Sequence, residues 1–189
     1  MSVRKVYTSF AFGGAEMQYT AFYQSPLGKL LLAEDEIGLC GVWFEGQKHY
    51  ANGLEKAQEE RETPLLKKTK EWLDLYFSGR EPGIQLKLHL VGTVFQREVW
   101  ESMLRIPYGQ VMTYGEIAAK IAAKRNVPHM SAQAVGAAVG RNKLSIIVPC
   151  HRVIGAGGSL TGYAGGLERK AGLLRLEHVD IEPHRLLVK

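Results

Sequence analysis

The sequence predicts an α+β protein with a sheet in its first half and helices in its second half. Residues 18–45 contain short apolar segments separated by turn residues, a pattern typical of consecutive antiparallel strands. Residues 93–140 instead contain stretches in which a Thr or Ser precedes a helical period of apolar residues. With 189 residues, the chain can bury a core as one domain or as two small ones.

We expect residues 1–16, which show no clear period, to be a loosely attached extension. Residues 17–92 are predicted to form the first domain, with hairpin connections at Pro26-Leu27-Gly28 and Glu36-Ile37-Gly38. Its predicted elements are strands at 18–25, 29–35 and 39–45, a charged loop or helix at 55–62, a helix at 65–77 and a strand at 84–90.

Residues 93–189 are predicted to form a second, mainly helical domain. Thr93 and Thr113 each begin a capping-box pattern, and Ser131 can cap a third helix. The predicted helices start at these caps and continue to about 104, 123 and 140, and a last one covers about 168–177. Two capped helices in series before an apolar segment at 145–148, predicted to be a short strand, resemble a helix-turn-helix with a wing.

Charge is unevenly distributed along the chain. The formal net charge is +5, and residues 93–189 hold 13 Lys and Arg against 7 Asp and Glu. A basic second half is the electrostatic footprint expected of a phosphate-binding surface, although solvated surface charge is an alternative. The two cysteines, Cys40 and Cys150, form neither a disulfide framework nor a zinc-ligand spacing, which favours a reducing, cytoplasmic location. No apolar run approaches the length of a membrane span, so we expect no membrane association.

The segment Pro149-Cys150-His151-Arg152 carries the clearest chemical signal. It follows the apolar residues 145–148 and precedes a glycine-rich stretch, so a thiol and an imidazole lie at the start of a loop. A reactive thiolate and an inert buried thiol are both compatible with this pattern, since reactivity depends on the thiol pKa.

The motifs around this segment resemble those of the O6-alkylguanine-DNA alkyltransferases, also called methylated-DNA–protein-cysteine methyltransferases. The resemblance is dense over about residues 93–178 and looser before them. It implies a ribonuclease-H-like first domain and a winged helix-turn-helix-like alkyltransferase domain. The motifs that carry it are Thr93-Val94-Phe95-Gln96, Ile106-Pro107-Tyr108-Gly109, Thr113-Tyr114-Gly115-Glu116, Gly140-Arg141-Asn142, Pro149-Cys150-His151-Arg152 and Gly162-Tyr163-Ala164-Gly165-Gly166.

The resemblance implies direct DNA repair, in which Cys150 accepts the alkyl group of O6-alkylguanine, or of O4-alkylthymine, once and irreversibly. His151 would be linked to the thiol through a water and to Glu177, while Asn142 braces the turn around the cysteine. Tyr114 would press on the phosphate beside the target nucleotide and hydrogen-bond the guanine after it is flipped out, because a thiol cannot reach a stacked base.

The resemblance also assigns a substrate pocket and a DNA-binding helix. Val153 and Ala164 would contact guanine through their backbones, Tyr163 would wall the pocket, and Ser145 stands near it. The small-residue helix from Ala132 would lie in the minor groove, although close packing on a neighbouring helix is the alternative reading. The implied DNA-binding residues are Tyr114, Ala132, Gln133, Ala134, Gly136 and Arg141.

No cofactor and no metal are expected, and the implied partner is alkylated double-stranded DNA bound by a monomer. Gln133 departs from the family, in which an arginine often fills the gap left by the flipped base. Two other classes remain: a non-catalytic protein that binds alkyl lesions, and a hydrolase built on Cys150, His151 and Glu177.

Overall fold

The computed structural model describes residues 17–182 and 185–186, so the predicted extension at 1–16 lies outside the described residues. A four-stranded sheet with the order β3-β2-β1-β4 forms its first part. The three predicted strands are confirmed as an antiparallel β1, β2 and β3. The strands are β1 (Gln18–Ser25), β2 (Gly28–Glu34), β3 (Leu39–Phe44) and β4 (Gln58–Glu60).

The loop or helix predicted over residues 55–62 is an exposed loop, except that residues 58–60 form β4, which was not predicted. Strand β4 pairs in parallel with β1, so the sheet is mixed and not antiparallel throughout. Backbone bonds from Gln18 N to Ala57 O and from Arg61 N to Thr20 O tie the segment to the free edge of β1. Edge pairing needs only backbone groups, so an exposed charged sequence gives no signal for it.

Helix α1 (Pro64–Phe77) begins where Thr63 accepts a hydrogen bond from Leu66 N, as the sequence predicts. Residues of β2 alternate between two apolar clusters, as the period of a strand requires. Leu30 and Leu32 join the main core with buried residues of α1, whereas Leu31 packs with a smaller cluster on the other side of the sheet.

The predicted helices of the second half are confirmed, with ends that differ by at most two residues. Both capping boxes, at Thr93 and Thr113, are present, and Ser131 accepts from Ala134 N. Leu104 caps the carboxyl end of the first of these helices and is 41% exposed. The helices are α2 (Val94–Met103), α3 (Tyr114–Arg125), α4 (Ala132–Val139) and α5 (Leu167–Leu176).

Two predicted strands were wrong. Residues 84–90 make only the bridge between Leu39 and Leu88, and residues 145–148 form a turn in which Ile146 has φ +71°. Val148 N bonds Leu144 O and closes this turn, so the segment cannot run on as an extended strand. Leu144 instead makes one bridge to Val42 of β3, which joins the turn before Cys150 to the sheet edge.

Short elements complete the site region. Strand β5 (Met112–Thr113) pairs in parallel with β6 (Val153–Ile154), which places the start of α3 beside the chain that leaves Cys150. The sequence analysis did not predict this pair or the terminal hairpin. The other short elements are the 3₁₀ helices η1 (Cys150–Arg152) and η2 (Ala156–Gly158) and the strands β7 (Ile181–Glu182) and β8 (Arg185–Leu186).

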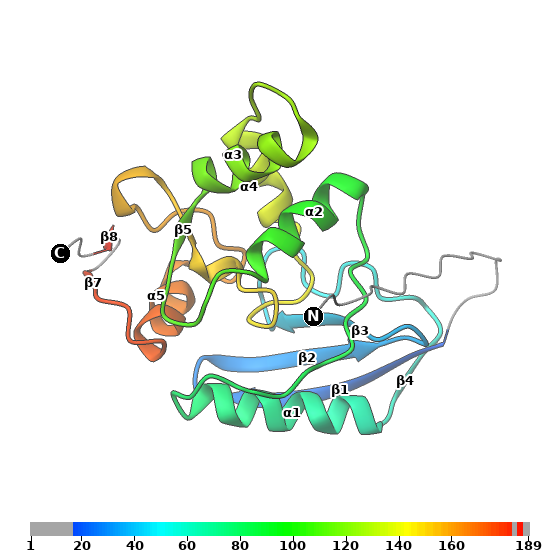
Figure 1. Cartoon of the computed structure of the whole chain (residues 1–189). Helices are drawn as coiled ribbons and strands as arrows, with labels where there is room; N and C mark the ends of the chain where they lie inside the picture. The colour runs from blue at the N-terminus through cyan, green and yellow to red at the C-terminus, as the bar shows by residue number, and fades with distance from the viewer. Residues whose placement is uncertain (1–16, 183–184, 187–189) are drawn as a thin grey trace.

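Both halves contribute to one main core. Leu32 of β2 and Tyr76 of α1 belong to the same cluster as Trp100 of α2, Val135 of α4 and Cys150. Figure 1 shows α1 running along the sheet and helices α2, α3 and α4 gathered on the side of β3. Within residues 17–182 and 185–186, no helix has the length and apolar character needed to span a membrane.

Candidate active site

Cys150 is the first residue of η1, and it is 4% exposed. The side chain of Asn142 holds the turn around it. Its amide nitrogen lies 3.1 Å from Cys150 Sγ and donates to Val148 O at 2.9 Å, and its oxygen accepts from Leu144 N at 3.0 Å. One buried amide therefore connects both arms of the turn to the sulfur atom.

Burial raises the pKa of the Cys150 thiol, and the hydrogen bond from Asn142 and the charge of Lys170 offset only part of this increase. The thiol therefore carries its proton near neutral pH, and a nucleophilic thiolate requires a base that takes the proton. The sequence pattern was compatible with a reactive thiolate and with an inert buried thiol, and this environment favours a protonated thiol before any reaction.

His151 and Glu177 form a fully buried pair, with His151 Nε2 2.6 Å from Glu177 Oε1. Burial lowers the pKa of His151 despite the neighbouring carboxylate, so the imidazole is neutral near pH 7. A carboxylate can only accept, so Nε2 carries the proton and Nδ1 has the free lone pair. Nδ1 is buried and has no hydrogen-bond partner within the described part of the chain.

Glu177 is held by several donors from separate elements. Arg152 donates from Nε to Oε2 at 2.8 Å and from Nη2 to Oε1 at 3.0 Å, and Gly109 N donates to Oε2 at 3.1 Å. Burial by itself would raise the pKa of Glu177, but the hydrogen bonds from His151 and Arg152 and the charge of Arg152 lower it to about 2. Arg152 thus helps to keep the carboxylate ionised.

Lys170 is a buried cation that the sequence analysis missed. Its Nζ donates to Val153 O at 2.6 Å and to Thr161 O at 2.7 Å, which ties the two sides of the glycine-rich loop together. Burial lowers its pKa to about 8, while the nearby Cys150 acts in the opposite direction. Its burial could have been predicted from its helical spacing from Leu173 and Leu174, because this spacing places it on the inner face of α5.

Tyr114 and Tyr163 lie close to the thiol, as expected for pocket residues. The Tyr114 hydroxyl donates to Thr161 O at 3.0 Å, and both burial and the charge of Cys150 raise its pKa to about 12. Tyr163 is buried, and its burial and the same cysteine raise its pKa well above the usual range. Both hydroxyls therefore remain protonated and able to donate hydrogen bonds.

The first half of the chain reaches the pocket through a loop after β3. Gln47 Oε1 accepts from Ser145 Oγ at 3.1 Å, and Lys48 N donates to Ala164 O at 3.0 Å. The sequence analysis identified Ser145 and Ala164 but neither of their partners. Val153 O, expected to accept from the guanine amino group, already accepts from Lys170.

The predicted DNA-binding residues share the outer side of α4 and its ends. Ala132, Gln133 and Arg141 are exposed, and Ala134 and Gly136 are half-buried. The Tyr114 ring lies close enough to Gly136 that an added Cβ there would be 3.7 Å from it. The structure therefore brings this helix and Tyr114 together.

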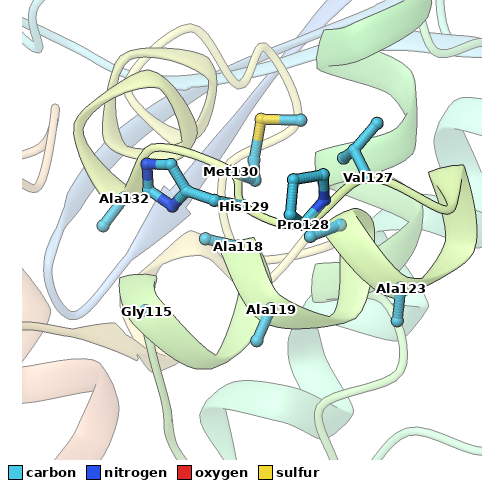
Figure 2. Close-up of a pocket in the computed structure, with 10 residues that line it drawn as sticks. Gly115, Ala118, Ala119, Ala123, Val127, Pro128, His129, Met130 and Ala132 are labelled. Atoms are coloured by element: carbon cyan, nitrogen blue, oxygen red, sulfur yellow. The ribbon is translucent and has the colours of Figure 1, made fainter.

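A groove of about 470 Å³ borders this surface but contains none of the residues around the thiol. Figure 2 shows the small side chains of α3 on one side and the chain from Val127 to Ala132 on the other. Its lining residues are Gly115, Ala118, Ala119, Ala122, Ala123, Val127, Pro128, His129, Met130 and Ala132.

The fold and the site define a protein in which a buried cysteine is followed directly by a buried imidazole–carboxylate pair, beside a pair of capped helices. The hydrogen bond from Asn142 and the His151–Glu177 pair set the surroundings of this thiol apart from an apolar core.

Comparison with known proteins gives the family. The model described as "6-O-methylguanine DNA methyltransferase, ribonuclease-like domain" matches residues 18–90, and the DNA-binding-domain model of the same family matches residues 94–179. The methylated-DNA–protein-cysteine methyltransferase of Methanosarcina acetivorans is 44% identical over 84% of this chain and 97% of its own length. The constitutive enzyme of that name from Bacillus subtilis is 42% identical over 87% and 98%.

A solved structure agrees with these sequence relatives. The crystal structure of Mycobacterium tuberculosis OGT in complex with DNA superposes with a TM-score of 0.71 and 40% identity, covering 85% of this chain and 92% of that chain. This chain belongs to the methylated-DNA–protein-cysteine methyltransferase family.

Proposed function

We propose that this protein repairs DNA by direct reversal, with Cys150 as the single-use acceptor of the alkyl group of O6-alkylguanine. Its relatives are methylated-DNA–protein-cysteine methyltransferases, which supports this function for the whole chain. The observation that carries the assignment to Cys150 is the buried His151–Glu177 pair that follows it, with the proton on Nε2 and a free lone pair on Nδ1.

In the proposed reaction, the Cys150 thiol gives its proton to His151 Nδ1, directly or through one water, and Glu177 stabilises the imidazolium that forms. The sulfur attacks the alkyl carbon, a C–S bond forms, and the bond between that carbon and guanine O6 breaks with its electron pair going to guanine. Hydrogen bonds from the Tyr114 hydroxyl and the Ala164 N–H are proposed to stabilise the guanine anion, which then takes up a proton from solvent. The thioether has no hydrolysis step, so each molecule reacts once.

DNA is the proposed partner, bound through the minor groove by α4. Its side chains are mostly small, which lets the helix backbone approach closely, and it follows α3 as the second helix of a helix-turn-helix. Tyr114 stands at the start of α3 between this surface and the thiol, where it can meet a nucleotide that leaves the stack.

Several finer assignments belong to this proposal. Guanine is held by the carbonyls of Cys150 and Val153 and walled by Tyr163, with Ser145 behind the pocket. O4-alkylthymine is a second substrate, the amino-terminal domain at 17–92 has a ribonuclease-H-like fold, and the domain at 93–189 is winged helix-turn-helix-like. The protein acts as a monomer without a cofactor, and its cytoplasmic location stays a prediction.

Incubation with a duplex containing O6-methylguanine should leave the intact protein one methyl group heavier, in stoichiometric amount, with the label on Cys150. Cys150→Ser should abolish transfer and retain DNA binding. Cys40→Ser is the matched control, since Cys40 is equally buried and should leave transfer unchanged. Turnover beyond one equivalent, or transfer that survives Cys150→Ser, would contradict the proposal and favour a hydrolase or another acceptor.

A further inference from the structure

Tyr76 belongs to α1, in the half of the chain where the sequence indicates no chemistry, yet it is fully buried beside the His151–Glu177 pair. Its hydroxyl donates to Glu177 Oε1 at 2.7 Å and lies 3.2 Å from His151 Nε2. His151 Nε2 is bonded to the same oxygen of Glu177. Side chains from α1, from η1 and from the end of α5 therefore meet at one carboxylate oxygen.

Aromatic neighbours fix the direction of the Tyr76 ring. It stacks on Trp72, with centroids 5.4 Å apart and an interplanar angle of 9°, and meets Phe77 edge-on at 5.4 Å. Tyr108 and the His151 ring approach it at 6.1 Å and 6.3 Å, also with steep interplanar angles. A ring packed on several sides leaves the hydroxyl little freedom except rotation about its C–O bond.

The Tyr76 hydroxyl remains a donor over the working pH range. Burial and the negative charge of Glu177 raise its pKa well above the usual value. The other charged or titratable groups that face it are His151, Arg152, Tyr108 and Tyr163. Glu177 also keeps its bonds to Arg152, so the hydroxyl of Tyr76 is not needed to keep the carboxylate ionised.

We propose that Tyr76 is a positioning residue for alkyl transfer, which holds Glu177 Oε1 and the His151 imidazole so that Nδ1 can take the proton of the Cys150 thiol. This inference rests on the proposed function of Cys150. It gives the amino-terminal half a direct part in the chemistry, because the proton acceptor of the second half is oriented by a hydroxyl from the first. Without that hydroxyl, the Glu177 carboxylate is the remaining hydrogen-bond partner of the imidazole among the described residues.

Tyr76→Phe tests this, because it keeps the ring and removes only the hydroxyl. Transfer from free O6-benzylguanine should become about tenfold slower near neutral pH, since the bond lost is one to a charged group. The deficit should shrink as the pH rises past the ordinary thiol value of about 8.5, where solvent can remove the proton. Tyr23→Phe is the matched control, because it also removes a tyrosine–carboxylate bond, to Asp74 at 2.8 Å, in the same half but away from the site. It should leave the rate unchanged at every pH.

A rate unchanged in Tyr76→Phe, or a deficit of equal size at all pH values in a variant that unfolds like the wild type, would overturn the inference. A measurement on the wild type keeps the test valid if the variant fails to fold. The ¹⁵N shifts of His151 should show a proton on Nε2 and none on Nδ1 near neutral pH, and the opposite tautomer would also overturn it. If the wild type itself transfers no alkyl group to Cys150, the proposed function fails instead.

Discussion

Cys40 and Cys150 lie in different halves of the chain and have the same exposed fraction, 4%. Burial raises the pKa of both thiols, to about 12 for Cys40, where the negative charge of Asp35 adds to the effect. A lysine lowers the pKa of each thiol, Lys143 at Cys40 and Lys170 at Cys150, but Asp35 opposes this at Cys40, whereas Asn142 bonds the sulfur of Cys150. The two thiols are therefore equally buried, and they differ in the charges and hydrogen-bond donors around the sulfur.

The sheet half and the helical half also differ in the groups that they contribute to the site. The sheet half contributes packing, one edge to which the turn before Cys150 attaches, and three polar contacts near the site from Tyr76, Gln47 and Lys48. The helical half carries the thiol, the imidazole, the carboxylate and the buried amine.

The largest effect is expected from removing the charge of the carboxylate. Glu177→Gln should slow alkyl transfer about 100-fold near neutral pH, the usual scale for losing general-base assistance. Because burial raises the pKa of Cys150, the deficit should close only above the ordinary thiol value of about 8.5. Rates on free O6-benzylguanine across pH measure this. Glu168→Gln, an exposed change in the same helix, should have no effect. A loss that does not vary with pH would mean that Glu177 is structural.

The same substitution tests the acid stability of the site. The folded pKa of Glu177, about 2, is below the usual 4.5, so its stabilisation is present above pH 4.5 and is lost as the pH falls towards 2. The free energy of unfolding of the wild type, measured as a function of pH, should fall over this range. The Glu177→Gln variant should not show this fall.

An intermediate effect is expected at the lysine beside the reactive thiol. Lys170→Met removes the cation that lowers the Cys150 pKa, so transfer should slow about tenfold near neutral pH, which corresponds to one pKa unit. Lys143→Met removes the lysine beside Cys40 and serves as the control, since it should leave transfer unchanged. Thiol titration by absorbance at acidic and alkaline pH measures the shift directly. Equal rate losses in Lys170→Met and Lys143→Met would contradict the expectation that the lysine beside Cys150 affects transfer and the lysine beside Cys40 does not.

The smallest effect is expected on the DNA-binding surface. Gln133 is exposed on α4, where it can hydrogen-bond the base left unpaired, but it lacks the charge and planar fork of arginine. Gln133→Arg should raise the rate on duplex DNA about threefold by favouring the flipped state, and Gln133→Ala should lower it. Neither should alter the reaction with free O6-benzylguanine, which needs no flipping. Unchanged duplex rates in both variants would mean that Gln133 does not fill the gap.

Patterns among residues close together in the sequence predicted most of the helices and strands. The hairpin strands and the capped helices were predictable because each depends on residues close in sequence. Strand β4 and the β5–β6 pair were missed because their partners are distant in the chain. The turn at 145–148 looked like a strand, since apolar content does not reveal that Ile146 adopts a positive φ.

The site, like the fold, was only partly predictable from the sequence. The sequence by itself determined which residues could supply the chemistry: a cysteine next to a histidine, a later glutamate and a helix of small side chains. Only the tertiary structure decided that the glutamate accepts from the histidine and the arginine together, that Lys170 is buried beside the thiol, and that Tyr76 reaches the pair from the other half. The physical reason is that a pKa and a tautomer depend on the burial and charge of groups brought together in space, and spacing along the chain contains no information about them.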